Sequence, residues 1–322
     1  MSAVRLHLLP ALVCCIAAQG CAAWQRPGEA LGAHLDPAVG ARYVHTAEGR
    51  ALYVEVRGEE GALPPVLLVH GFASNHDVWD TLEPDLRPGR RTVNVDLPGF
   101  GWSTRTEGDY SPVALAHDLD AVLAALDIAQ ADVVAHSWGS SVTLALALEH
   151  PARVRRIALI GGWIYDEQIP PFFRWARLPG VGEMLFTAFY DERPADRFPA
   201  AFEDPSLVSQ ELVDAIERSF VRPGTSRAAL AAARGQCFRQ LQARYREVTQ
   251  PALLLWGAGD NVSFPRFGQR LANELPHARY VELPRAGHFP MVEALGATRA
   301  ALHGFLDVAA QQPPVPEAGG PS

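Results

Sequence analysis

A single serine stands where a short apolar run meets a run of good helix formers. Residues 135–139 read AHSWG, directly after DVV at 132–134, and the Ala- and Leu-rich stretch that follows ends before Pro151. A sharp strand-to-helix turn holds a serine in strained backbone geometry and needs small residues two positions before and after it. Ala135 and Gly139 meet that need. The sequence therefore predicts a buried strand, a turn at Ser137 and a helix whose positive N-terminal end lies beside the serine.

Two later segments place a carboxylate and an imidazole just beyond other apolar strands. Residues 253–260 read LLLWGAGD, a buried-looking strand that enters a glycine turn and ends in Asp260. Residues 285–290 read RAGHFP and place His288 in a loop after the candidate strand 279–283. The order Ser137, Asp260, His288 is the one expected of a serine hydrolase built on an α/β sheet.

These segments, together with two more, resemble the α/β-hydrolase superfamily over about residues 42–310. The other two are a strand that opens into a glycine turn, VLLVHGF at 66–72, and the loop DLPGFGWS at 96–103. The turn around the serine departs from the commonest form, because Ala135 stands where glycine is usual. The resemblance implies an enzyme, a serine hydrolase of the esterase or lipase kind.

The chemistry assigns a role to each side chain. A serine hydroxyl needs a base within hydrogen-bond reach, and an imidazole suits the task, so His288 is the expected base of Ser137. A carboxylate on the other ring nitrogen orients the imidazole and stabilises its charge, which is the role expected of Asp260. The oxyanion formed by attack on a carbonyl needs two fixed N–H donors, and we expect them from the backbone of Phe72 and Trp138.

Other residues compete for two of these roles. His70 and His136 are alternative bases, but His70 is expected to brace the oxyanion loop, and His136 is expected to point away from the nucleophile if strand alternation continues. Asp166 is an alternative acid, because it follows another apolar strand. Asp260 is favoured because a glycine turn delivers it.

Strand and helix segments alternate along most of the chain, which predicts an α/β fold with a mostly parallel central sheet and helices on both faces. The expected strands are 51–56, 66–70, 91–96, the run at 132–134, 154–160, 252–256 and 279–283, and the expected helices include 77–86, 112–126, 140–150, 265–275 and 292–309. The predicted organisation is a signal segment at 1–23, a linker at 24–40, a hydrolase core at 41–162 and 249–310, an inserted segment at 163–248, and a disordered tail at 311–322.

The inserted segment breaks the alternation, and the resemblance implies that it forms a helical cap over the active site. Some of its aromatic side chains would line an apolar pocket, while most would be ordinary packing. A peptidase would also need a carboxylate there to hold the substrate amine, for which Glu183 and Glu203 are candidates. The aromatic residues are Trp163, Phe172, Phe173, Trp175, Phe186, Phe189, Tyr190, Phe198 and Phe202.

The first 23 residues are typical of an export signal. Arg5 and His7 precede an apolar run at 8–18, which is shorter than the roughly 20 residues that span a bilayer. Residues 18–21 read AQGC, similar to a bacterial lipoprotein cleavage box in which Cys21 would be acylated; cleavage after Ala23 is the competing interpretation. Both predict a protein of the cell envelope, either anchored in a membrane through a lipidated Cys21 or periplasmic or secreted.

Charge and motif content narrow the function further. The chain has 36 acidic and 28 basic residues, a net charge of −8, and no basic run, which argues against a nucleic-acid partner. No Cys-x-x-Cys or His-Glu-x-x-His pattern appears, so neither a metal nor a cofactor is expected. The prediction is hydrolysis of a carboxylic ester of a small to medium apolar substrate through an acyl-enzyme on Ser137. Carbon–carbon bond hydrolysis and aminopeptidase action on the same triad are alternatives, and a non-catalytic binding protein of this fold is a third.

Overall fold

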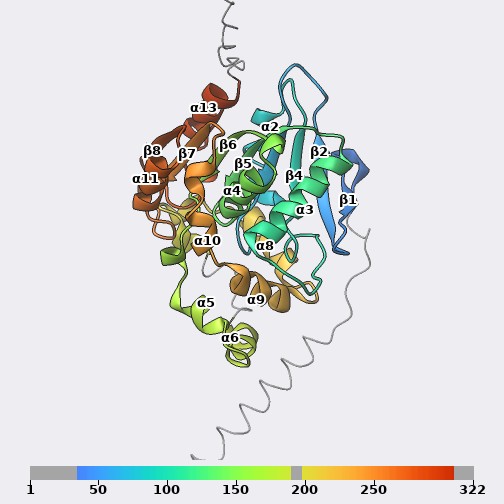
Figure 1. Ribbon diagram of the computed structural model, residues 1–322, viewed down its shortest axis with the longest axis vertical. Coiled ribbons are helices and arrows are strands. Elements are labelled where there is room, and N and C mark those ends of the chain that lie inside the picture. Colours follow the sequence, from blue (N-terminus) through green and yellow to red (C-terminus); the bar gives the residue numbers. More distant parts are fainter. Residues whose placement is uncertain (1–34, 190–197, 308–322) are drawn as a thin grey trace, which may run out of the picture.

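An eight-stranded sheet forms the centre of the molecule in the computed structural model, which describes residues 35–189 and 198–307 (Figure 1). The strand order is β1-β2-β4-β3-β5-β6-β7-β8. The β1–β2 and β2–β4 pairs are antiparallel, and all others are parallel. The strands are β1 (Arg42–His45), β2 (Ala51–Arg57), β3 (Val66–Val69), β4 (Thr92–Val95), β5 (Ala131–His136), β6 (Val154–Ile160), β7 (Ala252–Gly257) and β8 (Ala278–Leu283).

Helices cover both faces of this sheet, as the sequence predicts. Side chains of successive residues in a strand point to opposite faces, so Leu67 and Val69 of β3 join one core cluster while Val66 and Leu68 join the other. Figure 1 shows α3 and α4 in front of the strands. The first cluster is covered by α3 (Pro112–Ala125), α4 (Gly139–Glu149) and α11 (Pro265–Glu274), and the second by α2 (Glu83–Leu86), α12 (Pro290–Glu293) and α13 (Leu295–Leu306).

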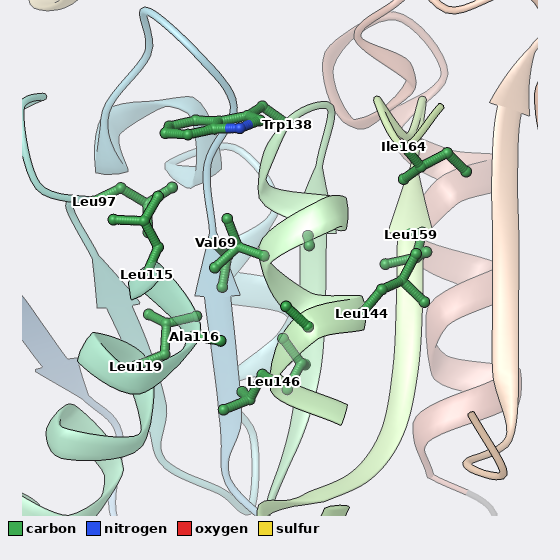
Figure 2. Close-up of a cluster of buried hydrophobic side chains, with 14 of the residues drawn as sticks. Val69, Leu97, Leu115, Ala116, Leu119, Trp138, Leu144, Leu146, Leu159 and Ile164 are labelled. Atoms are coloured by element: carbon green, nitrogen blue, oxygen red, sulfur yellow. The ribbon is translucent and has the colours of Figure 1, made fainter. Parts of the chain in front are cut away.

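The first cluster extends up to the turn that carries the candidate nucleophile. In Figure 2 the indole of Trp138 lies above Leu97 and Val69, with Leu144 and Leu159 deeper in the same layer. All of these side chains are fully buried. The end of β5 is therefore fixed by packing directly beneath the site.

Within its described residues, the interval between β6 and β7 holds five α-helices. Figure 1 shows α5, α6 and α9 at the end of the molecule opposite α13. The helix α6 packs on α5 and α9. The five are α5 (Pro171–Ala176), α6 (Val181–Phe189), α8 (Gln210–Phe220), α9 (Thr225–Gly235) and α10 (Arg239–Gln242).

Three local expectations differ from the structure. Strand β1 is not predicted, because Val44 alone in it is buried and the apolar signal is weak. The helix expected at 77–86 is a 3₁₀ turn, η2 (His76–Trp79), followed by the short helix α2. Pro84 explains the break, because proline fits the first turn of a helix and not its interior. The closing helix is interrupted at Ala294, between α12 and α13.

The predicted signal segment with Cys21 and the predicted tail lie outside the described residues, so export, lipid attachment and tail disorder stay predictions. Among the helices of residues 35–189 and 198–307, none is long and apolar enough to cross a membrane.

Candidate active site

Ser137 lies at the sharp turn that the sequence predicts. Its φ of 51° is in the left-handed region, which is strained for a residue with a side chain. Its N–H donates to the Ile160 carbonyl at 2.9 Å, and its carbonyl accepts from Trp163 N at 2.9 Å. A Cβ at Gly139 would lie 2.5 Å from the His70 carbonyl oxygen, so only glycine fits there. The methyl group of Ala135 is accommodated in the core.

Asp260 and His288, which follow β7 and β8, form a buried pair. His288 Nδ1 lies 2.9 Å from Asp260 Oδ2. The other carboxylate oxygen accepts from the backbone N–H groups of Val262 at 2.9 Å and Ser263 at 2.7 Å. The exposed fraction is 2% for Asp260 and 4% for His288. Because both carboxylate oxygens are held, the carboxylate fixes the orientation of the imidazole.

Ser137 and His288 line one cavity of about 360 Å³. Its wall is mainly aromatic, and no Lys, Arg, Asp or Glu belongs to the described residues that line it. The sequence separates these two side chains by about half the chain, and the fold brings them to the same cavity. The aromatic wall includes Phe72, Trp163, Phe172, Phe173, Phe198 and Phe220.

The expected oxyanion donors also lie at this cavity. Phe72 and Trp138 both line it, and their rings meet edge to face with centroids 5.9 Å apart. A Cβ on Gly71 would come within 2.9 Å of the Ser137 Cβ. The backbone that enters Phe72 therefore runs directly beside the candidate nucleophile, and a glycine is needed for that close approach.

The two alternative histidines occupy different positions. His70 is fully buried; Leu97 N donates to its Nε2 at 2.8 Å, so Nδ1 carries the proton and donates to the Gly71 carbonyl at 2.7 Å. It therefore braces the loop beside Ser137. Burial lowers the pKa of His70, which favours this neutral form.

His136, which is expected to point away from the nucleophile, lies beside the candidate base. Its ring lies 4.7 Å from that of His288, its Nε2 is 2.8 Å from the His288 carbonyl oxygen, and it lines the cavity. Strand alternation does place His136 on the opposite face from Ala135, but the loop that carries His288 and Phe289 packs on that same face. Burial and the nearby His288 lower its pKa well below the usual value.

The alternative acid Asp166 serves another purpose. Its Oδ1 accepts from the backbone N–H of Phe238 at 2.7 Å, and Arg239 lies 3.6 Å from Oδ2. It thereby ties the start of the inserted segment to its end. The structure pairs His288 with Asp260 and not with Asp166.

The aromatic residues of the inserted segment divide between cavity and core. Trp163, Phe172, Phe173 and Phe198 line the cavity. Phe186 and Phe202 belong to the core clusters, whereas Trp175 is 60% exposed. Tyr190 and the side chain of Phe189 lie outside the described part. Neither candidate cap acid lines the cavity: Glu183 pairs with Arg234 at 2.9 Å, and Glu203 lies in the segment that packs on the His288 loop.

Glu293 holds the loop of the candidate base, and the sequence gives no reason to single it out. Its Oε1 accepts from Gly287 N at 2.9 Å and Phe289 N at 3.2 Å, the residues on either side of His288. Its Oε2 accepts from Glu203 N at 2.7 Å. His288 N itself donates to the Ala201 carbonyl at 2.8 Å. The inserted segment and the base are thus joined through one carboxylate.

A second buried histidine–carboxylate pair, His76 with Asp96, lies next to His70, and sequence reasoning misses its histidine. His76 Nδ1 is 2.9 Å from Asp96 Oδ1, and Asp96 also accepts from Trp102 N at 2.7 Å. Burial lowers the pKa of His76, but the neighbouring carboxylates, Asp96 above all and then Asp77 and Glu55, outweigh it and raise the pKa to about 10. His76 is therefore a buried imidazolium at neutral pH.

A larger depression of about 660 Å³ lies elsewhere, between residues 106–110 and the helix α9. Its lining includes Glu107, Asp109, Arg227 and Arg234. It has no serine, cysteine or histidine among its lining residues. Of these two cavities, the one at Ser137 has a nucleophile and a base.

Comparison with known proteins agrees with this geometry. The chain belongs to the family with the alpha/beta hydrolase fold, which matches residues 64–295, and it is a hydrolase by that membership. It is 29% identical to the 2-hydroxymuconate semialdehyde hydrolase of Pseudomonas sp. (strain CF600) over 77% of this chain and 88% of that protein. It is 31% identical to the dihydrolipoyllysine-residue acetyltransferase component of the acetoin cleaving system of Pseudomonas putida, over 80% of this chain and 67% of that protein.

Solved structures give the same family. A hydrolase from Pseudomonas aeruginosa PA01 superposes with a TM-score of 0.70 at 25% identity, over 83% of this chain and 98% of that one. The predicted fold class and superfamily are confirmed.

Proposed function

We propose that this hydrolase cleaves a carboxylic ester of a small to medium apolar substrate through an acyl-enzyme on Ser137. The observation that carries the proposal is the meeting of Ser137 with the His288–Asp260 pair at one cavity whose described lining has no Lys, Arg, Asp or Glu. We interpret the inserted segment as a cap that supplies much of the aromatic wall.

In this mechanism His288 takes the Ser137 proton on Nε2 as the serine oxygen attacks the ester carbonyl. Asp260 holds Nδ1–H and stabilises the imidazolium. The backbone N–H groups of Phe72 and Trp138 bind the oxyanion, and loss of one such donor typically costs about 3–4 kcal/mol of transition-state stabilisation. His288 then protonates the leaving alcohol, and the same base activates the water that releases the acid from Ser137.

Carbon–carbon bond hydrolysis is a second candidate, because one relative is named as a 2-hydroxymuconate semialdehyde hydrolase. A muconate semialdehyde carries a carboxylate. The described residues that line the cavity include no Lys or Arg to neutralise such a group, and a buried anion without a partner is unfavourable. The cavity wall therefore favours an uncharged ester. It also offers no carboxylate for a substrate amine, which counts against aminopeptidase action.

A substrate panel tests the proposal. We expect p-nitrophenyl esters of short and medium acyl chains to be turned over faster than aminoacyl anilides and aryl-substituted diketones, with all turnover lost in Ser137→Ala. Intact mass spectrometry after a brief reaction should show the acyl group on wild-type protein. Faster cleavage of the diketones would move the assignment to carbon–carbon hydrolysis, and turnover of esters by Ser137→Ala would exclude the acyl-enzyme.

A further inference from the structure

One polar side chain of the inserted segment lines the catalytic cavity without its hydrogen bonds being complete. Gln236 is 1% exposed, and its Nε2 has no hydrogen-bond partner among residues 35–189 and 198–307. Buried amide groups are nearly always paired, so an unpaired N–H at a cavity wall calls for an explanation. A ligand that accepts a hydrogen bond there is one.

The orientation of this amide is fixed by chemistry. Trp163 Nε1 lies 2.9 Å from Gln236 Oε1, and an indole N–H can only donate. The oxygen must therefore face the indole, which leaves the two N–H bonds of Nε2 for another acceptor. A flipped amide would set two donors against each other.

The same tryptophan ties Gln236 to the candidate nucleophile. The backbone N–H of Trp163 donates to the Ser137 carbonyl at 2.9 Å, while its indole holds Gln236. Gln236 is thus one side chain removed from the turn that carries Ser137. A donor placed in this way is positioned relative to the scissile bond of any substrate bound at Ser137.

A second unpaired polar group at the cavity comes from outside the inserted segment. Ser74, which follows the turn after β3, also lines the cavity, is 4% exposed, and has no partner for its Oγ within the described residues. His136 Nδ1 and Trp138 Nε1, of two other lining residues, also have no hydrogen-bond partner within the described residues. The aromatic wall is therefore interrupted by neutral polar atoms from both the core and the inserted segment.

We propose that the substrate carries a second carbonyl oxygen, of a ketone or an amide, that accepts a hydrogen bond from Gln236 Nε2. This inference rests on the proposed ester hydrolysis and names its substrate class: oxo- or acylamino-substituted esters rather than plain alkyl esters. The second group is neutral, because an amide donor and a hydroxyl solvate a carbonyl, whereas a carboxylate would need a cation that the described lining lacks.

Matched pairs of esters test this directly. On the acyl side, kcat/KM is measured for the p-nitrophenyl esters of 4-oxopentanoate, 5-oxohexanoate and 6-oxoheptanoate, each against the ester without the oxo group. On the alcohol side, the butyrate of 4-hydroxybutan-2-one is compared with butyl butyrate. Wild type should prefer at least one oxo ester by about tenfold or more, because a site built to donate to an oxygen discriminates against the analogue that lacks it.

Two variants separate recognition from structure. Gln236→Glu keeps an acceptor for the Trp163 indole, and Gln236→Leu removes both functions. Measured at pH 8, each should lower kcat/KM for the preferred oxo ester about tenfold more than for its plain partner, which brings the oxo preference to about one. Gln250→Leu is the control: Gln250 is a second buried glutamine with an unpaired atom, but it does not line the cavity, and the preference should survive.

A preference near one in every pair for wild type overturns the inference, and so does an equal loss on both members of a pair in the Gln236 variants. Turnover of the plain esters distinguishes this result from failure of the proposed function. If wild type does not cleave plain esters at all, ester hydrolysis itself is wrong. If it cleaves them with no preference, only carbonyl recognition is wrong.

Discussion

Two buried histidine–carboxylate pairs flank the loop beside Ser137, and they differ in what lies beyond the imidazole. In both pairs, the imidazole Nδ1 lies 2.9 Å from a carboxylate oxygen. Each carboxylate also accepts hydrogen bonds from backbone N–H groups. His288 lines the cavity with Ser137. The Nε2 of His76 instead lies 3.4 Å from Asp77 and 3.5 Å from Glu55.

This difference decides the chemistry of the two rings. The extra carboxylates keep His76 protonated, with a pKa of about 10, so it has no lone pair with which to accept a proton. His288 instead lines the cavity together with Ser137. A carboxylate on one nitrogen therefore does not by itself make a base; the surroundings of the other nitrogen decide whether the pair is catalytic or structural.

The largest effect should come from the pair at the cavity. Asp260→Asn is expected to lower kcat on a p-nitrophenyl ester by about 10⁴-fold, because the imidazole loses its orientation and its charge stabilisation. Thermal unfolding should change little by comparison. Asp166→Asn is the control, and a comparable loss of kcat in that variant would reassign the acid.

Loss of the His76–Asp96 pair should instead lower the stability of the protein. His76→Ala leaves Asp96 buried without its cation, which is expected to lower the free energy of unfolding by about 3–5 kcal/mol in urea titrations. The folded fraction should retain esterase turnover within about tenfold of wild type. A variant with unchanged stability but 10³-fold lower kcat, about 4 kcal/mol, would make His76 part of the catalytic machinery.

The pH dependence of stability sharpens the same contrast. The pKa of His76 is raised in the folded state, so its contribution is fully present below the unfolded value of 6.5 and is lost as the pH rises through about 10. Urea unfolding of wild type should lose about 2–4 kcal/mol between pH 7 and 10.5. The loss should be much smaller in His76→Asn. Parallel curves for the two proteins would contradict the assignment of a buried imidazolium.

The smallest effect is expected at the link between the inserted segment and the base. Glu293→Gln keeps one acceptor oxygen for the four backbone N–H groups that bond to this side chain, but it weakens the hold on the His288 loop. We expect kcat to fall by about tenfold with KM nearly unchanged, since the base is less well positioned and the cavity is kept. A rise in KM alone would instead place Glu293 in substrate binding.

The part of the site that sequence predicts is the part encoded locally. The small residues around Ser137 and the glycine turns before Asp260 and His288 can be recognised from a few neighbouring positions, because the backbone there cannot accept larger residues. Parallel strands then bring these turns to one edge of the sheet. The central strands are predicted for the same reason, since both faces are buried and the apolar runs are continuous.

Residues whose roles depend on contacts far along the chain are not predicted. Gln236 acquires its orientation from Trp163, 73 positions earlier, and His76 acquires its charge from Asp96, 20 positions later. Alternation correctly assigns His136 to a face of the sheet, but it says nothing of the His288 loop that packs there. Edge strand β1 is missed because its burial is too slight to leave an apolar pattern.

The most direct test of the central claim is the rate at which a fluorophosphonate labels the protein, with the modified residue mapped by mass spectrometry. Wild type should be labelled at Ser137, His288→Ala should lose the label almost completely, and folded His76→Asn should be labelled at close to the wild-type rate. Labelling at another residue, or equal loss in the two histidine variants, would contradict the assignment of His288 as the base and of His76 as a structural cation.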